Sequence, residues 1–255
     1  MEKLITPKTT QKIHGDTLII FFKDYILSHL SSVKNVVIIE VGSERGAGST
    51  FKLSNLSNSW GCKFITIDAA EIRTNDALKI VKKVNPSFEA IHALGEKYIE
   101  SYDQNNIGLC YLDAFDLVVE DYTLDGDFIK TYTERSVDLT NEAAYKMHYD
   151  ACVALKNKII KGGFICFDDV WIDENNIWQG KGKTAIPYIL SNGFTLIAYK
   201  KTSALFQKTE GYSDEEIKRI LEASKSVNLD MKIFIRRLKR IPFNILQVIK
   251  EFGRK

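Results

Sequence analysis

Cysteine is scarce in this chain and follows no pattern. Four cysteines occur in 255 residues, and none of them forms a Cys-x-x-Cys pair. Metal–thiolate sites and disulfide frameworks depend on closely spaced or paired cysteines, so the sequence indicates neither. Cys110 and Cys166 lie in apolar runs, where a thiol behaves as a small buried hydrophobe.

A strong net charge and long apolar runs are also absent. The formal net charge is +2 at pH 7, so the positive charge typical of nucleic-acid-binding proteins is missing. No apolar run approaches the ~20 residues that a membrane-spanning helix needs, and the first residues lack the apolar core of a signal peptide. We therefore expect a cytoplasmic protein with no nucleic-acid partner and no transmembrane segment. Hydrophobic residues at 45% and charged residues at 27% fit one large α/β domain.

The stretch Val36–Thr50 organises the chain. Its first part, Val-Val-Ile-Ile-Glu-Val, is apolar and β-branched without alternation, which is typical of a parallel strand that is buried on both faces. A turn with Gly42, Gly46 and Gly48 follows, and a helix then begins near Ser49. The glycine spacing is not the G-x-G-x-x-G of dinucleotide-binding proteins. An acid, Glu40, stands two residues before the first glycine. A strand, a glycine-rich turn and a helix predict the ligand-binding corner of a doubly wound sheet, although an ordinary turn that binds nothing has the same form.

Strands and helices alternate along the rest of the sequence. We expect a doubly wound, mostly parallel sheet within a domain that spans residues 1–230. The expected helices are Thr17–Leu30, Thr74–Val84 and Glu142–Ile160, the last of them capped by Lys161-Gly162-Gly163. After the first strand, the expected strands are Lys63–Ile67, Phe88–His92, Ile107–Leu112, Phe164–Phe167, Thr195–Tyr199 and Ala204–Lys208.

Acidic residues follow three of these strands. Asp68 ends the second strand, where a carboxylate can accept hydrogen bonds from ribose hydroxyls; it could equally cap a helix. Asp113 ends the fourth strand, and Asp168 and Asp169 end the fifth. If these two strands are neighbours, their carboxylates converge, and a hard cation such as Mg²⁺ would relieve the repulsion. Alternatively, one acid binds a cofactor, one caps a helix and one faces water.

Two sets of motifs resemble known enzymes. The acid-x-glycine pattern at Glu40–Gly42 resembles motif I of class I S-adenosylmethionine (SAM) methyltransferases, which have a Rossmann-like fold. The runs Tyr111–Asp116, Lys161–Trp171 and Gly180–Leu190 resemble the bacterial sugar and small-molecule O-methyltransferases of that class. The resemblance has two departures: the glycine turn is not the compact G-x-G-x-G form, and a lid-like insertion, residues 116–141, replaces a short link.

The resemblance implies a role for each motif residue. It implies that SAM is held by Glu40, Gly42, Ser43, Gly46, Ser49, Asp68, Leu94, Gly95 and Asp113. It further implies that Asp113, Asp168 and Asp169 hold Mg²⁺ against the acceptor's hydroxyls. Asp113 and Asp168 are therefore also predicted to be catalytic residues.

His148 is the candidate general base, because histidine titrates near neutrality without tuning. A lone histidine is also often structural, so packing or capping remains the alternative. Trp171, Trp178 and Tyr122 could stack on a sugar face or simply anchor loops.

The C-terminal segment, residues 231–255, combines apolar residues with several arginines and lysines. It predicts either a basic amphipathic helix on an anionic membrane surface or a helix that docks on the sheet or on a second subunit of a homo-oligomer. Pro242 interrupts the helical pattern and favours docking.

Taken together, these features predict a SAM-dependent O-methyltransferase that acts on a sugar or another polyhydroxylated acceptor, in surface-glycan or natural-product biosynthesis. Methyl transfer is an in-line displacement, so such an enzyme mainly positions and deprotonates its acceptor. An NAD(P)-dependent oxidoreductase shares the strand, turn and acid, but the sequence lacks both G-x-G-x-x-G and a suitably placed Tyr-x-x-x-Lys pair. A non-catalytic scaffold that binds a partner or a membrane through the basic segment is the third hypothesis.

Overall fold

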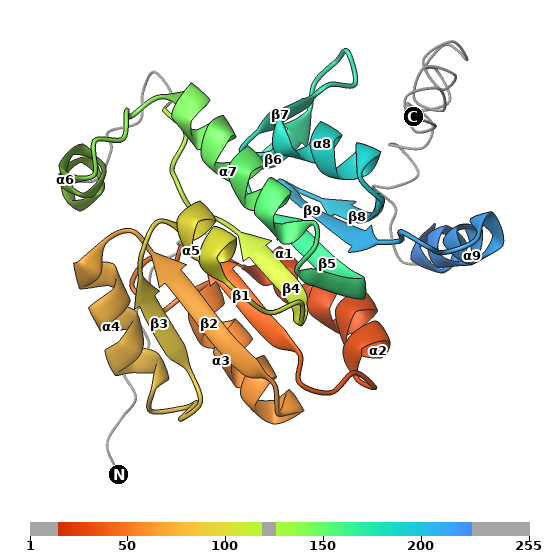
Figure 1. The fold of residues 1–255 in the computed structure, drawn as a ribbon, viewed down its shortest axis with the longest axis horizontal. Coiled ribbons are helices and arrows are strands. Elements are labelled where there is room, and N and C mark those ends of the chain that lie inside the picture. Colours follow the sequence, from red (N-terminus) through yellow and green to blue (C-terminus); the bar gives the residue numbers. More distant parts are fainter. Residues whose placement is uncertain (1–14, 119–125, 226–255) are drawn as a thin grey trace.

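A sheet of seven strands runs through the molecule, with helices on both of its faces (Figure 1). The computed structural model describes residues 15–118 and 126–225. Along the sheet the strands are ordered β3-β2-β1-β4-β5-β9-β8, and a separate hairpin pairs β6 with β7. The strands are β1 (Val37–Val41), β2 (Lys63–Asp68), β3 (Glu89–His92), β4 (Ile107–Leu112), β5 (Ile159–Phe167), β6 (Val170–Ile172), β7 (Trp178–Gly180), β8 (Phe194–Lys200) and β9 (Ser203–Lys208).

The prediction of a doubly wound, mostly parallel sheet is confirmed. Strands β3, β2, β1, β4 and β5 pair in parallel, and β9 pairs antiparallel with both β5 and β8. The direction of winding reverses between β1 and β4, and ligands bind at this point of such sheets, beyond the carboxyl ends of the strands. β4 and β5 are neighbours, and Leu112 pairs with Phe167. The ends that carry Asp113 and Asp168 therefore lie side by side, which is the condition under which the sequence predicts that their carboxylates converge.

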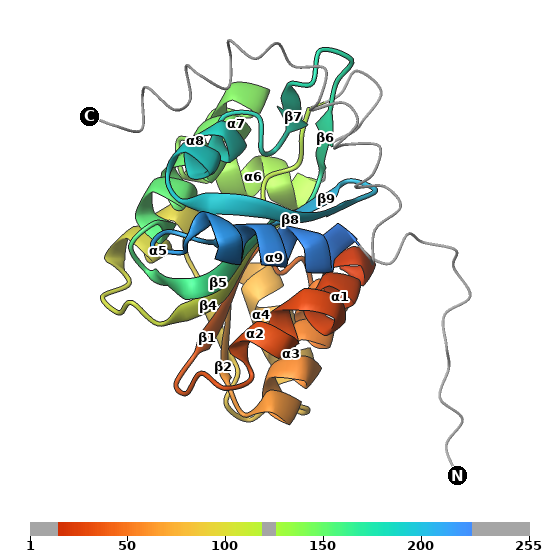
Figure 2. The same cartoon turned by 90° about the vertical axis from the view of Figure 1, so that its right-hand side faces the viewer.

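Two layers of helices cover the sheet (Figure 2). One apolar core joins α1, α2, α3 and α4 to one face, and a second core joins α5, α7 and α8 to the other. All five residues of β1 are buried, as expected for a strand that is covered on both sides. The helices are α1 (Asp16–Phe21), a π-helical turn (Phe22–Ile26), α2 (Leu27–Leu30), α3 (Ser49–Trp60), α4 (Glu71–Val81), α5 (Gly95–Ser101), α6 (Gly126–Glu134), α7 (Asn141–Leu155), α8 (Ala185–Ser191) and α9 (Asp214–Lys225).

The predicted boundary between the long helix and the fifth strand is wrong. Helix α7 ends at Leu155 rather than at Ile160, and strand β5 already begins at Ile159, which pairs with Ile107 of β4. The two glycines expected as a helix cap instead lie within β5, where the register with β4 shifts. Gly162 has a φ of +76°, so it forms a bulge that an L-residue would adopt only with strain. Pairing with β4 therefore overrides the local helix-ending signal.

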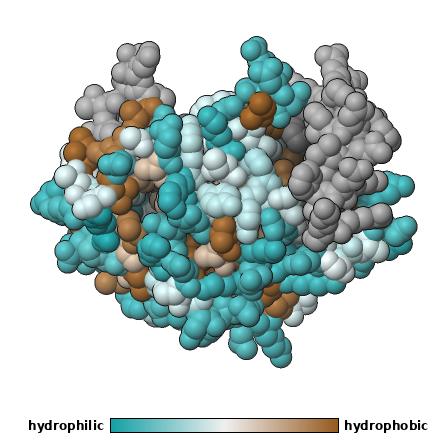
Figure 3. Space-filling model, turned by 45° about the horizontal axis from the view of Figure 1, so that its top comes forward, coloured by the Kyte–Doolittle hydropathy of each residue, from teal (hydrophilic) through white to brown (hydrophobic). Residues whose placement is uncertain are grey.

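Parts of the predicted domain plan lie outside the described residues. Segment 231–255 is among them, as is Tyr122. Of the expected insertion, residues 116–118 and 126–141 are described, and the latter contain α6. Within the described part of the chain, no helix is long and apolar enough to cross a membrane. On the face that Figure 3 shows, apolar residues gather in small separate patches among hydrophilic ones.

Gly108 offers a test of the packing of β4 against helix α2 and the residue that precedes β1. A Cβ atom at this position would lie 2.2 Å from Cγ1 of Val36 and 3.0 Å from Cδ1 of Leu30, which are both buried. We predict that Gly108→Ala lowers the free energy of unfolding by about 1–3 kcal/mol through overpacking. Urea denaturation measures the change, and Gly126→Ala, whose added Cβ would meet no atom of the described residues within 4 Å, is the matched control. Equal stability of the two variants would contradict the packing described here.

Candidate functional site

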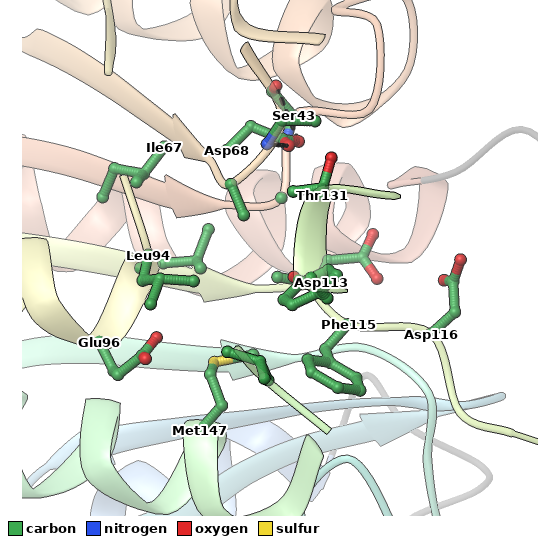
Figure 4. Close-up of a pocket in the computed structure, with 18 of the residues that line it drawn as sticks. Ser43, Ile67, Asp68, Leu94, Glu96, Asp113, Phe115, Asp116, Thr131 and Met147 are labelled. Atoms are coloured by element: carbon green, nitrogen blue, oxygen red, sulfur yellow. Dashed lines mark hydrogen bonds between the residues drawn. The ribbon is translucent and has the colours of Figure 1, made fainter. Parts of the chain in front are cut away.

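A cavity of about 640 Å³ opens at the carboxyl ends of β1, β2 and β4 (Figure 4). Its volume lies in the range of small-molecule sites. Seven of the nine residues predicted to hold SAM line it: Gly42, Ser43, Ser49, Asp68, Leu94, Gly95 and Asp113. The other two, Glu40 and Gly46, do not.

The turn after β1 approaches the end of β4 closely. Gly42 has a φ of +98°, and a Cβ atom there would lie 2.6 Å from the backbone oxygen of Asp113. The Gly42 N–H donates to the oxygen of Ile67, 2.8 Å away, which also ties the turn to β2. Only glycine fits this conformation and this contact, so the backbone itself forms the floor of the cavity.

Asp68 forms a second part of the wall, at the end of β2. Its Oδ2 accepts hydrogen bonds from the backbone N–H and the hydroxyl of Ser43, at 3.0 and 3.2 Å, and its Oδ1 accepts one from the N–H of Ala70 at 2.9 Å. Burial raises the pKa of this carboxyl above its usual value, although these hydrogen bonds oppose the shift. Asp68 thus holds the glycine turn in place and also lines the cavity (Figure 4).

Glu40 lies beneath the cavity and does not reach its surface. The side chain is fully buried. Ser49 donates to its Oε1 at 2.6 Å, and Thr66 donates to its Oε2 at 2.7 Å. Burial raises the pKa of Glu40 to about 7. The carboxyl group therefore links β1, β2 and the start of α3, and its contact with the cavity is indirect. Gly46 also faces away, because a Cβ there would lie 2.6 Å from Cα of Ala77 in α4.

The opposite wall is largely apolar and comes from several elements. Phe115, Tyr132, Ala144 and Met147 form one buried cluster, with Leu94 packed against it. Phe115, Tyr132, Met147 and Leu94 also line the cavity. Tyr132 belongs to α6, so the described part of the predicted insertion contributes to the site. Glu96 of α5 lies on the same side, near Met147 (Figure 4).

Lys181 stands among the acids for which a magnesium ion was predicted. Its side chain is 1% exposed. Its Nζ lies 3.0 Å from Oδ1 of Asp113 and 3.0 Å from Oδ2 of Asp169. Burial by itself would lower the pKa of the ammonium group, but the two carboxylates outweigh burial and hold the pKa above its usual value. Burial also raises the pKa of Asp113 to about 6, against the attraction of Lys181.

Asp168 turns away from the cavity. Its Oδ2 accepts from the hydroxyl of Tyr111 at 2.9 Å, and its Oδ1 accepts from the hydroxyl of Ser203 at 2.8 Å. The same Tyr111 hydroxyl lies 3.1 Å from Oδ2 of Asp113. Asp113 and Asp169 line the cavity, and Asp168 does not. Asp168 thus connects the end of β5 to β9 and, through Tyr111, to Asp113.

The predicted magnesium site does not fit this arrangement. A divalent ion binds to several converging carboxylate oxygens, whereas here an ammonium group occupies the space between two of the acids and the third faces a phenol and a serine. Among residues 15–118 and 126–225, no three acidic, histidine or cysteine side chains are grouped so that they could hold a metal ion. We therefore correct the assignment of Asp113, Asp168 and Asp169 as metal ligands.

His148 is buried in α7 and does not line the cavity. Its Nδ1 lies 2.8 Å from the oxygen of Ala144, and because a carbonyl only accepts, Nδ1 carries the proton. Its Nε2 has no hydrogen-bond partner in the described part of the chain. Burial lowers the pKa of His148 to about 3. This position does not suit the predicted general base, which must contact the acceptor.

Sequence reasoning missed Lys181, Tyr111 and the apolar wall. The motif Gly180–Leu190 includes Lys181, but a lysine in a glycine-rich turn resembles a solvated surface residue. Its burial follows from the β6–β7 hairpin, for which no strand was predicted.

Comparison with known proteins finds distant likenesses among solved structures. No protein-family model matches the chain, and no curated protein matches it. Among solved structures, the DszA carbon methyltransferase is similar at 10% identity and a TM-score of 0.44, over 77% of this chain and 53% of that protein. An rRNA methylase from Streptococcus thermophilus is similar at 10% identity and a TM-score of 0.44, over 72% and 94%. A geranyl diphosphate methyltransferase in complex with sinefungin is similar at 8% identity and a TM-score of 0.42, over 67% and 57%. The chain thus spans only about half the length of the first of these proteins.

The buried carboxyl of Glu40 predicts a dependence of stability on pH. Its pKa is raised from 4.5 to about 7 in the folded protein, so the folded state binds more protons than the unfolded state between these values. Stability from this group is therefore present below pH 4.5 and is lost as the pH rises through about 7. We predict that Glu40→Gln reduces this loss, as measured by urea denaturation across pH 4.5 to 8. The prediction is contradicted if both proteins lose the same stability over that range.

Proposed function

We propose that this protein is a SAM-dependent methyltransferase that methylates a hydroxyl group of a sugar or of another polyhydroxylated acceptor. One observation carries the proposal: the glycine turn after β1, the acid that ends β2 and the acid that ends β4 line a single cavity. These three parts come from strands that meet where the sheet reverses its direction of winding.

The residues of the cavity fit the parts of SAM. Asp68 would bind the ribose hydroxyls, because a carboxylate accepts hydrogen bonds from neighbouring hydroxyls. Leu94 and Met147 would contact the adenine through their apolar side chains. The turn at Gly42 and Ser43 would hold the methionine part, since both residues line the cavity beside Asp113.

The acceptor would enter on the side of Asp169. This side chain lines the cavity, is 42% exposed and is held by the ammonium group of Lys181. Trp171 follows in β6 and is also exposed, so its ring offers an apolar face for a sugar. Trp178, by contrast, is buried and packs edge-on against Tyr199 and Phe206, which makes it part of the core.

Methyl transfer requires the protein mainly to position the two reactants. Bound SAM supplies an electrophilic methyl group on a sulfonium. The acceptor oxygen would gain this methyl group as the sulfur–methyl bond breaks, and the acceptor hydroxyl would lose a proton. Asp169 lies at the cavity wall, where it can orient that hydroxyl and accept the proton. Alignment of the two reactants accounts for much of the rate enhancement in such a displacement.

Calorimetry with S-adenosylhomocysteine tests the cofactor. We predict binding of S-adenosylhomocysteine and no binding of NADH. Asp68→Ala should weaken the affinity for S-adenosylhomocysteine roughly tenfold or more, because a buried charged acceptor of hydrogen bonds is lost. Asp76→Ala is the matched control, since this acid pairs with Arg45 on the outside of α4.

Tight NADH binding without S-adenosylhomocysteine binding would overturn the proposal in favour of an oxidoreductase. Methyl transfer from labelled SAM to a panel of nucleotide sugars and glycans tests the acceptor class. Methylation of amines or carbon acids in place of hydroxyls would overturn the O-methyl assignment alone.

A further inference from the structure

The buried ammonium group of Lys181 is the strongest feature that the cofactor does not account for. A buried charge is costly unless it is paired, and Lys181 is paired with two acids, Asp113 and Asp169, each at 3.0 Å. Both acids line the cavity. The ammonium group therefore lies directly behind the carboxylates that an acceptor would meet.

The β6–β7 hairpin sets this geometry through the backbone (Figure 1). Asp169 immediately precedes β6 and Lys181 immediately follows β7, and the N–H of Lys181 donates to the oxygen of Asp169 at 3.0 Å. Gly180 has a φ of +74°, and a Cβ atom there would lie 2.0 Å from that same oxygen. Asp169 itself has a φ of +50°, which is unusual for a residue with a side chain. A close backbone contact thus places the amine beside the two acids.

The Lys181 amine lies where the neighbouring acids require a positive charge. Asp113, Asp168 and Asp169 stand at adjacent strand ends, and the Tyr111 hydroxyl has one hydrogen to share between Asp113 and Asp168. A positive charge between Asp113 and Asp169 relieves their repulsion, which is the role that the sequence assigned to a metal ion.

We propose that Lys181 supplies, from within the chain, the positive charge that a divalent ion would otherwise provide, and that it is a positioning residue. It holds Asp113 and Asp169 so that their carboxylates receive hydrogen bonds from the acceptor. The identity of the acceptor rests on the proposed function. The role of Lys181 as an internal cation, a positive charge supplied by the chain itself, does not. Methyl transfer by this protein then needs no added divalent metal.

Binding of Mn²⁺, followed by electron paramagnetic resonance, tests the internal cation without any activity assay. Mn²⁺ accepts the same oxygen ligands as Mg²⁺. We expect Lys181→Met to bind Mn²⁺ roughly tenfold or more tightly than the wild type, because a repelling unit charge is gone from the centre of the acids. The gain should disappear in the double variant Lys181→Met/Asp169→Asn. Lys183→Met is the matched control: Lys183 is exposed, lies over the ring of Tyr145, and its loss should leave Mn²⁺ binding unchanged.

Two results would overturn the inference. The first is stoichiometric Mn²⁺ binding by the wild type that Asp169→Asn abolishes, since a metal would then displace the amine. The second is a folded Lys181→Met that gains no Mn²⁺ binding. If Lys181→Met does not fold, comparing Mn²⁺ binding by the wild type with Mn²⁺ binding by Asp169→Asn still tests the inference.

Activity adds a separate readout. We expect wild-type methyl transfer to be unchanged by excess chelator, Lys181→Met to lose it, and Lys181→Arg to recover part of it. S-adenosylhomocysteine affinity should remain within about threefold in Lys181→Met, because Lys181 does not line the cavity. Methyl transfer that stops with chelator and returns with Mg²⁺ contradicts the internal cation and leaves the methyltransferase proposal standing. Absence of any S-adenosylhomocysteine binding contradicts the proposed function. The role of Lys181 as an internal cation is then tested by the Mn²⁺ measurement alone.

Discussion

The close approach of the turn after β1 to the end of β4 determines where the rest of the site lies. Gly42 has no room for a side chain against the backbone of Asp113, so the two strand ends meet backbone to backbone. Glu40 secures the turn from below through Ser49 and Thr66, and Asp68 secures it from the side through Ser43. This contact and these hydrogen bonds hold the ends of β1, β2 and β4 together beside the cavity.

Ion pairing determines the arrangement of the acids at the ends of β4 and β5. The acids at the ends of β4 and β5 are adjacent because those strands pair, and such proximity needs a compensating charge. The chain provides one in Lys181, which the β6–β7 hairpin carries back to Asp169. His148 lies outside the cavity lining, buried and with a lowered pKa that keeps it neutral at pH 7.

Much of the sheet could be predicted from the sequence, because buried parallel strands have apolar, β-branched runs that end in acids and glycines. Seven of the nine residues that the resemblance to methyltransferases pointed to line one cavity, and their role in binding a cofactor stays a prediction. Contacts between distant segments could not be predicted: the pairing of β5 with β4 replaced a helix cap at Gly162 and Gly163, and the hairpin buried a lysine. Glu40 carries the expected residue type at the expected place, yet its role became clear only from its partners in β2 and α3.

A crystal structure of the protein with S-adenosylhomocysteine tests the central claim most directly. The account predicts the ribose hydroxyls on Asp68, the adenine between Leu94 and Met147, and the sulfur facing the side of the cavity that Asp169 lines. Lys181 should remain between Asp113 and Asp169 in that complex. A ligand bound anywhere other than beyond the ends of β1, β2 and β4, or its absence at saturating concentration, would contradict the account.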